Sequence, residues 1–167
     1  GGAVEAYRDA LEADGLSTYI VSGNWKNPDE VKAEIIKLNK RKPVLEGVVF
    51  IGDIPVALIR NAQHMTTAFK MNEDEFPFPE SSVPSDRFYD DLHLTFDFIC
   101  QDSVNTSHFY YKLREDSPQQ LRPTFYSGRI KYPGARGGDK YEAIAKYLAK
   151  AVREKKRANL LDCFVSF

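Results

Sequence analysis

Two charged side chains follow apolar, strand-like runs of this sequence. Asp53 lies in Gly47-Val-Val-Phe-Ile-Gly-Asp-Ile-Pro55, and Arg129 follows a second such run and Gly128. Ligands and catalytic groups collect at the carboxyl ends of parallel strands, so both blocks are placed where chemistry is expected. Asp53 is suited to ligating a cation or orienting a base, or else to capping its own turn. Arg129 is suited to holding a carboxylate bidentately, or else to a structural salt bridge with a loop aspartate.

An acidic and aromatic loop, Pro84-Ser-Asp-Arg-Phe-Tyr-Asp-Asp-Leu92, lies between these two blocks. Calcium takes roughly six to eight oxygen ligands, and Asp86, Asp90 and Asp91 are therefore candidate calcium ligands. Their spacing departs from the helix–loop–helix calcium pattern, and the glycine of that pattern is missing. The alternative is a solvated loop in which Asp86 caps a helix or a turn.

The three histidines are widely separated and follow no metal-ligand spacing. His64 comes soon after the Asp53 turn, and an acid–base pair of the two would make the chain a complete small enzyme. The sequence has no Gly-x-Ser-x-Gly elbow, phosphate-binding glycine loop or His-Glu-x-x-His zinc helix. No residue is therefore assigned as catalytic, and the candidate ligand-binding residues are Asp53, Asp86, Tyr89, Arg129 and His64.

Composition and charge argue against several classes of partner. The formal net charge of −1 gives no electrostatic reason to expect a nucleic acid or an anionic membrane. No apolar run approaches the roughly 20 residues that span a bilayer. The chain begins at Gly1 with neither an initiator Met nor a signal segment. Cys100 and Cys163 are too few for a disulfide framework and are expected as buried thiols, although a disulfide between them stays open.

The order of the predicted elements indicates an α/β protein. Asn27-Pro-Asp-Glu30 is typical of a helix start, with an N-cap, a first-turn proline and a glutamate three residues after the cap. Residues 54–122 interrupt the alternation of helix and strand and are expected to form an ordered insert with antiparallel strands at 94–99 and 109–113. We predict one domain over residues 1–167, a three-layer α/β/α fold with a mainly parallel, doubly wound sheet. The predicted helices cover residues 3–13, 27–42 and 139–157, and the other predicted strands cover 16–21, 48–51, 123–130 and 160–167.

Three motifs, taken in order, resemble the gingipain-like cysteine peptidases. They are the Val-Phe-Ile-Gly-Asp-Ile-Pro strand and turn, the Pro-Ser-Asp-x-x-Tyr-x-Asp-Leu loop, and a strand ending in Gly-Arg-Ile before a long amphipathic helix. The likeness runs from about residue 47 to residue 167. It implies a caspase-like α/β fold built from two sub-domains. The positions that match the shared pattern are Gly52, Asp53, Pro55, Ser85, Asp86, Tyr89, Asp91, Gly128 and Arg129.

The resemblance implies a scaffold rather than an enzyme. In such peptidases the catalytic His-Gly and the later Cys follow the strand that residues 160–167 would form, so neither is carried onto this chain. The expected role is a front sub-domain that braces a downstream catalytic half, outside the cytoplasm. The expected interaction is burial of that last strand, against the downstream half or in self-association. The alternative is a stand-alone binding module for calcium or a small polar or peptidic ligand over Asp53, the 86–91 loop and Arg129.

Overall fold

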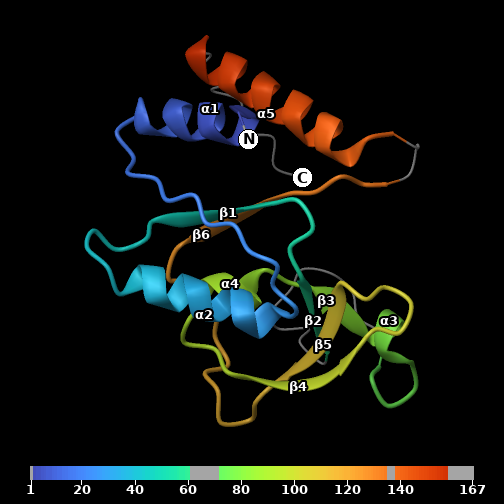
Figure 1. The fold of residues 1–167 in the computed structure, drawn as a ribbon. Helices are drawn as coiled ribbons and strands as arrows, with labels where there is room; N and C mark the ends of the chain where they lie inside the picture. Colours follow the sequence, from blue (N-terminus) through green and yellow to red (C-terminus); the bar gives the residue numbers. More distant parts are fainter. Residues whose placement is uncertain (1, 61–71, 135–137, 158–167) are drawn as a thin grey trace. The chain divides into compact units, whose positions relative to one another are not determined.

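The structure is a computed structural model that describes residues 2–60, 72–134 and 138–157 (Figure 1). The chain divides into two compact units. One consists of residues 24–130, and the other joins residues 1–23 to residues 131–167. His64, Cys163 and the strand predicted over 160–167 lie outside the described residues.

The helix α2, Pro28–Asn39, begins where the sequence predicts it. The Asn27 side chain accepts a hydrogen bond from the N–H of Glu30 at 2.9 Å, and the Glu30 carboxylate accepts one from the N–H of Lys26 at 2.7 Å. These two bonds fix the start of the helix, as a capping box does. The buried residues of α2 are Pro28, Val31 and Ile35.

Residues 24–130 form two separate sheets. The smaller sheet pairs β1, Gly47–Ile51, in parallel with β6, Tyr126–Ile130. The larger sheet has the strand order β3-β2-β5-β4. In that order its strands are Ser82–Pro84, Val56–Arg60, His108–Leu113 and Phe96–Gln101. β2 and β5 are parallel, whereas β3 and β4 are antiparallel to their neighbours.

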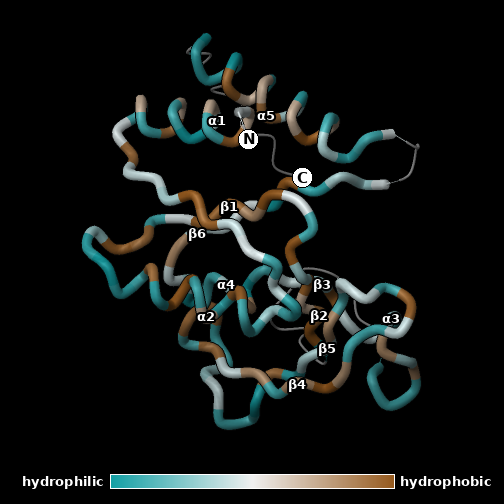
Figure 2. Tube along the Cα trace, viewed as in Figure 1, coloured by the Kyte–Doolittle hydropathy of each residue, from teal (hydrophilic) through white to brown (hydrophobic). Residues whose placement is uncertain are grey.

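The main core of this unit lies on one face of the larger sheet. Ala57 and Ile59 of β2 contribute to it, as do alternate residues of β5, the buried face of α2 and the short helix α4, Arg87–Asp90. Val56 and Leu58 point to the opposite face, where they pack with Tyr110 and with Phe78 of α3, Phe78–Ser81. Because both faces are covered, β2 is apolar nearly throughout. Figure 2 shows this apolar stretch, and that of β1.

The other unit contains two helices, α1 (Gly2–Glu12) and α5 (Lys140–Lys156). α1 begins and ends one residue before the predicted segment 3–13, and α5 lies within the predicted segment 139–157. The Asp139 carboxylate caps α5 by accepting hydrogen bonds from the N–H groups of Tyr141 at 2.8 Å and Glu142 at 3.4 Å. Ala10 of α1 and Leu148 of α5 are buried. An ion pair between Asp14 and Lys155 links the end of α5 to the residues that follow α1.

The α/β class predicted from the sequence is confirmed, and its parallel pairing is confirmed for β1 with β6 and for β2 with β5. The larger sheet is mixed rather than mainly parallel. Its four strands all come from the predicted insert at 54–122, in which antiparallel pairing was expected. The central strand β2 was not predicted, and β1 is only partly covered, with a single buried residue, Phe50.

The predicted strand at 16–21 is wrong, because these residues take no regular structure. Leu16, Tyr19, Ile20 and Val21 are each more than 40% exposed within the described structure. A strand needs a neighbour that accepts and donates its ladder hydrogen bonds. High β-propensity alone does not supply one.

Ile59 tests the central position of β2. The side chain is 0% exposed, so Ile59→Ala should lower the free energy of unfolding by about 2 to 5 kcal/mol through lost burial and a residual cavity. The matched change Ile99→Ala, on the outer strand β4 where the side chain is 36% exposed, should cost much less. Urea unfolding followed by circular dichroism measures both, and equal costs would contradict a central β2.

Candidate functional site

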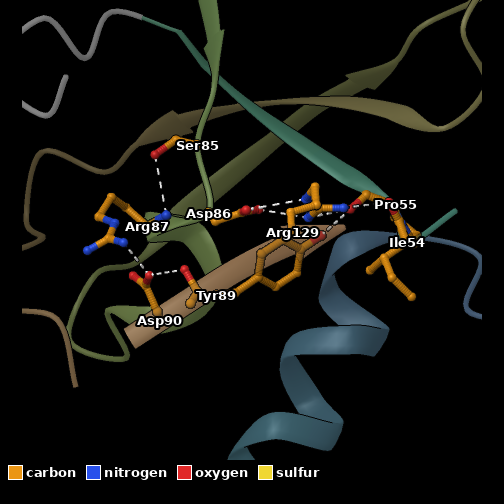
Figure 3. Close-up of polar contacts among 9 residues, drawn as sticks. Ile54, Pro55, Ser85, Asp86, Arg87, Tyr89, Asp90 and Arg129 are labelled. Carbon is orange, nitrogen blue, oxygen red and sulfur yellow. Dashed lines mark hydrogen bonds and ion pairs between the residues drawn. The ribbon is translucent and has the colours of Figure 1, made fainter. Parts of the chain in front are cut away.

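Arg129 of β6 holds Asp86, the residue before α4, through two hydrogen bonds (Figure 3). Its Nε donates to Oδ2 at 3.2 Å and its Nη2 donates to Oδ1 at 2.7 Å. This is the bidentate geometry that a planar guanidinium offers a carboxylate. The structural salt bridge to a loop aspartate that the sequence allows for Arg129 is therefore present.

The same guanidinium binds the turn between β1 and β2. Arg129 Nη1 donates to the main-chain oxygen of Ile54 at 2.9 Å, and Nη2 donates to that of Pro55 at 3.4 Å. Its Cζ lies 4.9 Å from the centre of the Phe50 ring. The Arg129 side chain is 16% exposed. A guanidinium with so little access to water needs acceptors from the protein, and the turn and Asp86 provide them.

Tyr89 reinforces the turn from α4. Its hydroxyl donates to the main-chain oxygen of Pro55 at 2.7 Å, and the residue is fully buried. Burial raises the pKa of the Tyr89 phenol well above its usual value, and the nearby Arg129 opposes this only in part. The phenol therefore stays protonated and remains a donor to the turn.

Asp90 is a buried carboxylate with two partners. Oδ2 accepts a hydrogen bond from the Ser127 hydroxyl at 2.5 Å and forms an ion pair with Arg87 Nη2 at 2.5 Å. Oδ1 is buried and has no hydrogen-bond partner in the described part of the chain. Burial raises the pKa of the Asp90 carboxyl, while Ser127 and Arg87 act in the opposite direction.

The Asp91 carboxylate accepts hydrogen bonds from two main-chain N–H groups. Oδ1 accepts from the N–H of His93 at 3.2 Å, and Oδ2 accepts from the N–H of Arg122 at 2.6 Å. The first bond closes an Asx turn, and the second fastens the loop to the segment that leads into β6. Asp91 is buried.

The three carboxylates proposed as calcium ligands thus bind three different sets of protein donors. Asp86 binds a guanidinium, Asp90 a hydroxyl and an arginine, and Asp91 two backbone N–H groups. Over residues 2–60, 72–134 and 138–157, no group of three or more His, Cys, Asp or Glu side chains could hold a metal ion. Asp86 also makes no capping hydrogen bond to α4, because its carboxylate is turned to Arg129. The calcium site stays a prediction that this geometry does not favour.

Asp53 is exposed and lies on the turn that the Arg129 contacts support. The preceding Gly52 has a φ of +90°, a conformation that favours glycine, and its N–H donates to Ile130 O at 2.9 Å. The pair of Asp53 with His64 stays a prediction, because His64 lies outside the described residues.

Two contributors to this network were missed in the sequence. Arg87 could have been found, because its spacing of three residues from Asp90 suits an ion pair on one helical turn. Ser127 could not, because only the tertiary fold brings its hydroxyl to a carboxylate 37 residues away.

Comparisons with protein-family models, with curated proteins and with solved structures found no match. Within the described residues, no helix has both the length and the apolar character that crossing a membrane requires.

Loss of the Arg129 guanidinium should strongly destabilise the unit formed by residues 24–130. Arg129→Gln leaves the Asp86 carboxylate and the turn carbonyls short of donors, and should lower the free energy of unfolding by about 2 to 4 kcal/mol. Arg114 is the matched control, since it is also an arginine paired with aspartate, here Asp97 and Asp116, but is 45% exposed. Arg114→Gln should cost no more than about 1 kcal/mol. Chemical unfolding measures both variants, and similar small losses would contradict a structural role for Arg129.

The pH dependence of stability should distinguish Asp90 from an exposed aspartate. Burial raises the pKa of Asp90 in the folded protein, so the stability it contributes falls as the pH rises through that pKa. Asp90→Asn removes this loss. The unfolding free energy of the variant minus that of the wild type should therefore increase between about pH 3 and pH 7.

For Asp116→Asn, the difference in unfolding free energy between variant and wild type should change with pH in the opposite direction. Hydrogen bonds from Arg114 lower the pKa of Asp116, so the wild type gains stability as the pH rises and the same difference should decrease. Urea unfolding of both variants across that pH range measures the two slopes. Slopes of the same sign for the two variants would contradict the assignment of Asp90 as a carboxyl whose ionised form is disfavoured by burial.

Proposed function

We propose that the chain is a non-catalytic scaffold sub-domain of a protein related to the gingipain-like cysteine peptidases, and that it supports a downstream catalytic half. The observation that carries this proposal is the internal use of the Arg129 guanidinium. It binds Asp86 and the carbonyl oxygens of Ile54 and Pro55. A residue that holds three segments of its own chain together is better suited to a structural role than to a catalytic one.

The contacts also join the three sequence blocks on which the resemblance rests. The turn after β1 belongs to the first block, Asp86 and Tyr89 to the second, and Arg129 to the third. They meet at the main-chain oxygen of Pro55, which accepts from both Tyr89 and Arg129. This convergence supports reading the blocks as parts of one structural motif. A ligand at the same place would have to replace these contacts, which makes the stand-alone binding module the weaker candidate.

The finer features of the family belong to this proposal too. They are the three-layer, caspase-like arrangement, a location outside the cytoplasm, and burial of residues 160–167 against the catalytic half or against a second copy. Parallel pairing of β1 with β6 is compatible with the first of these.

The source gene tests the proposal directly. Reading past the codon for Phe167 should reveal about 150 to 250 further residues, one ordinary domain, with an apolar run that ends in His-Gly and a later one that ends in Cys. A continuation that lacks this pair, or a stop codon at that point, would contradict the scaffold proposal and favour the stand-alone binding module.

A further inference from the structure

A second polar cluster lies at the far end of the larger sheet. Arg60 is the last residue of β2, and its partners in register are Ser82 on β3 and Lys112 on β5. Residues paired in register have their side chains on the same face of a sheet, close enough to interact. The three side chains therefore form a row across three strands. The row crosses the carboxyl ends of β2 and β5, which are parallel.

The Arg60 guanidinium is held in a fixed orientation. Its Cζ lies 4.3 Å from the centre of the Phe78 ring. Nη2 donates to the main-chain oxygens of Glu73 and Phe76, the latter at 3.4 Å. Stacking on a ring and two carbonyl contacts order the guanidinium in advance of any ligand.

The Glu73 carboxylate lies between the two cations without a hydrogen bond to either. Its Oε2 is 3.6 Å from Arg60 Nε, and its Oε1 is 3.8 Å from Lys112 Nζ. Charge-assisted hydrogen bonds between such groups are usually about 2.7 to 2.9 Å long. The carboxylate thus provides charge but accepts no hydrogen bond from Arg60 Nε or Lys112 Nζ.

Three buried polar atoms in this cluster have no hydrogen-bond partner within the described residues: Arg60 Nε, Glu73 Oε2 and Ser82 Oγ. Ser82 is only 6% exposed. Buried donors and hydroxyls are nearly always paired, so a group of this kind in one place indicates a ligand or an ordered water.

We propose that Arg60, Lys112 and Ser82 bind the oxyanion of a small ligand, a phosphate or a carboxylate group, in place of the Glu73 carboxylate. Arg60 Nε and the Ser82 hydroxyl would donate to the bound oxygens. Lys112, whose side chain is 46% exposed, would supply charge from the solvent side. Glu73 is then an internal competitor for the site. This inference is independent of the scaffold proposal, since it uses none of the Arg129 contacts.

Titration calorimetry of the whole chain with inorganic phosphate, and separately with acetate, tests the site at constant ionic strength. Glu73→Gln removes the competing charge and should lower the Kd by about tenfold, which corresponds to about 1.4 kcal/mol of binding free energy. Glu142→Gln is the matched control. It makes the same change in net charge but removes a carboxylate from an exposed pair with Lys146 on α5, so it should leave the affinity unchanged.

Lys112→Gln and Ser82→Ala, made in the Glu73→Gln background, should each weaken binding severalfold. They are preferred to changes at Arg60, whose loss threatens the end of a central strand. Circular dichroism confirms that each variant is folded. Tighter binding of phosphate than of acetate assigns a phosphoryl ligand, and the reverse assigns a carboxylate.

Three results would overturn the proposal. One is the absence of binding in both the wild type and Glu73→Gln, which would leave ordered water as the partner of these atoms. Another is equal tightening in Glu142→Gln, which would show a general effect of charge. The third is binding that survives the Lys112 and Ser82 changes, which would place the anion elsewhere.

Discussion

The Arg129 guanidinium has little access to water, so its N–H groups must find acceptors within the protein. They find them in the Asp86 carboxylate and in two carbonyl oxygens of the turn that connects β1 to β2. That turn carries the chain from the smaller sheet to the larger one. The path of the chain between the sheets is therefore tied to one side chain on β6, and the start of α4 is fixed by the same contacts.

The acidic loop can be understood as an extension of this arrangement. Each carboxylate meets donors from a different part of the chain, so the loop is held from several directions. Asp90 accepts a hydrogen bond from Ser127 of β6. Asp91 accepts one from the N–H of Arg122, in the segment that precedes β6. Such a loop resembles a catalytic or metal-binding cluster in sequence, because both need several acidic groups close together. The hydrogen-bond partners distinguish a structural loop from such a cluster. Here the carboxylates are bound by arginines, a hydroxyl and backbone N–H groups of the same chain.

Local signals account for the elements that the sequence predicts well. Asn27 and Glu30 define the start of α2, an apolar run defines β1, and clusters of aromatic residues indicate β5 and β6. β2 was missed because Val56 to Ile59 is a short apolar run that begins directly after a proline, at the start of the segment expected to form an irregular insert. The segment at 16–21 failed for the opposite reason, since its composition suits a strand but no partner pairs with it in the described structure. The salt bridge of Arg129 was foreseen as one alternative. Its bonds to the turn carbonyls depend on contacts 74 and 75 residues apart in the sequence.

Arg129 and Asp86 act together to hold the fold. A double-mutant cycle with Arg129→Gln, Asp86→Asn and the combined variant measures their interaction free of the other contacts of each residue. We expect a coupling free energy of about 1 to 3 kcal/mol, as for directly bonded groups with limited exposure. Additive losses, with a coupling near zero, would contradict it and would make both side chains available for a ligand.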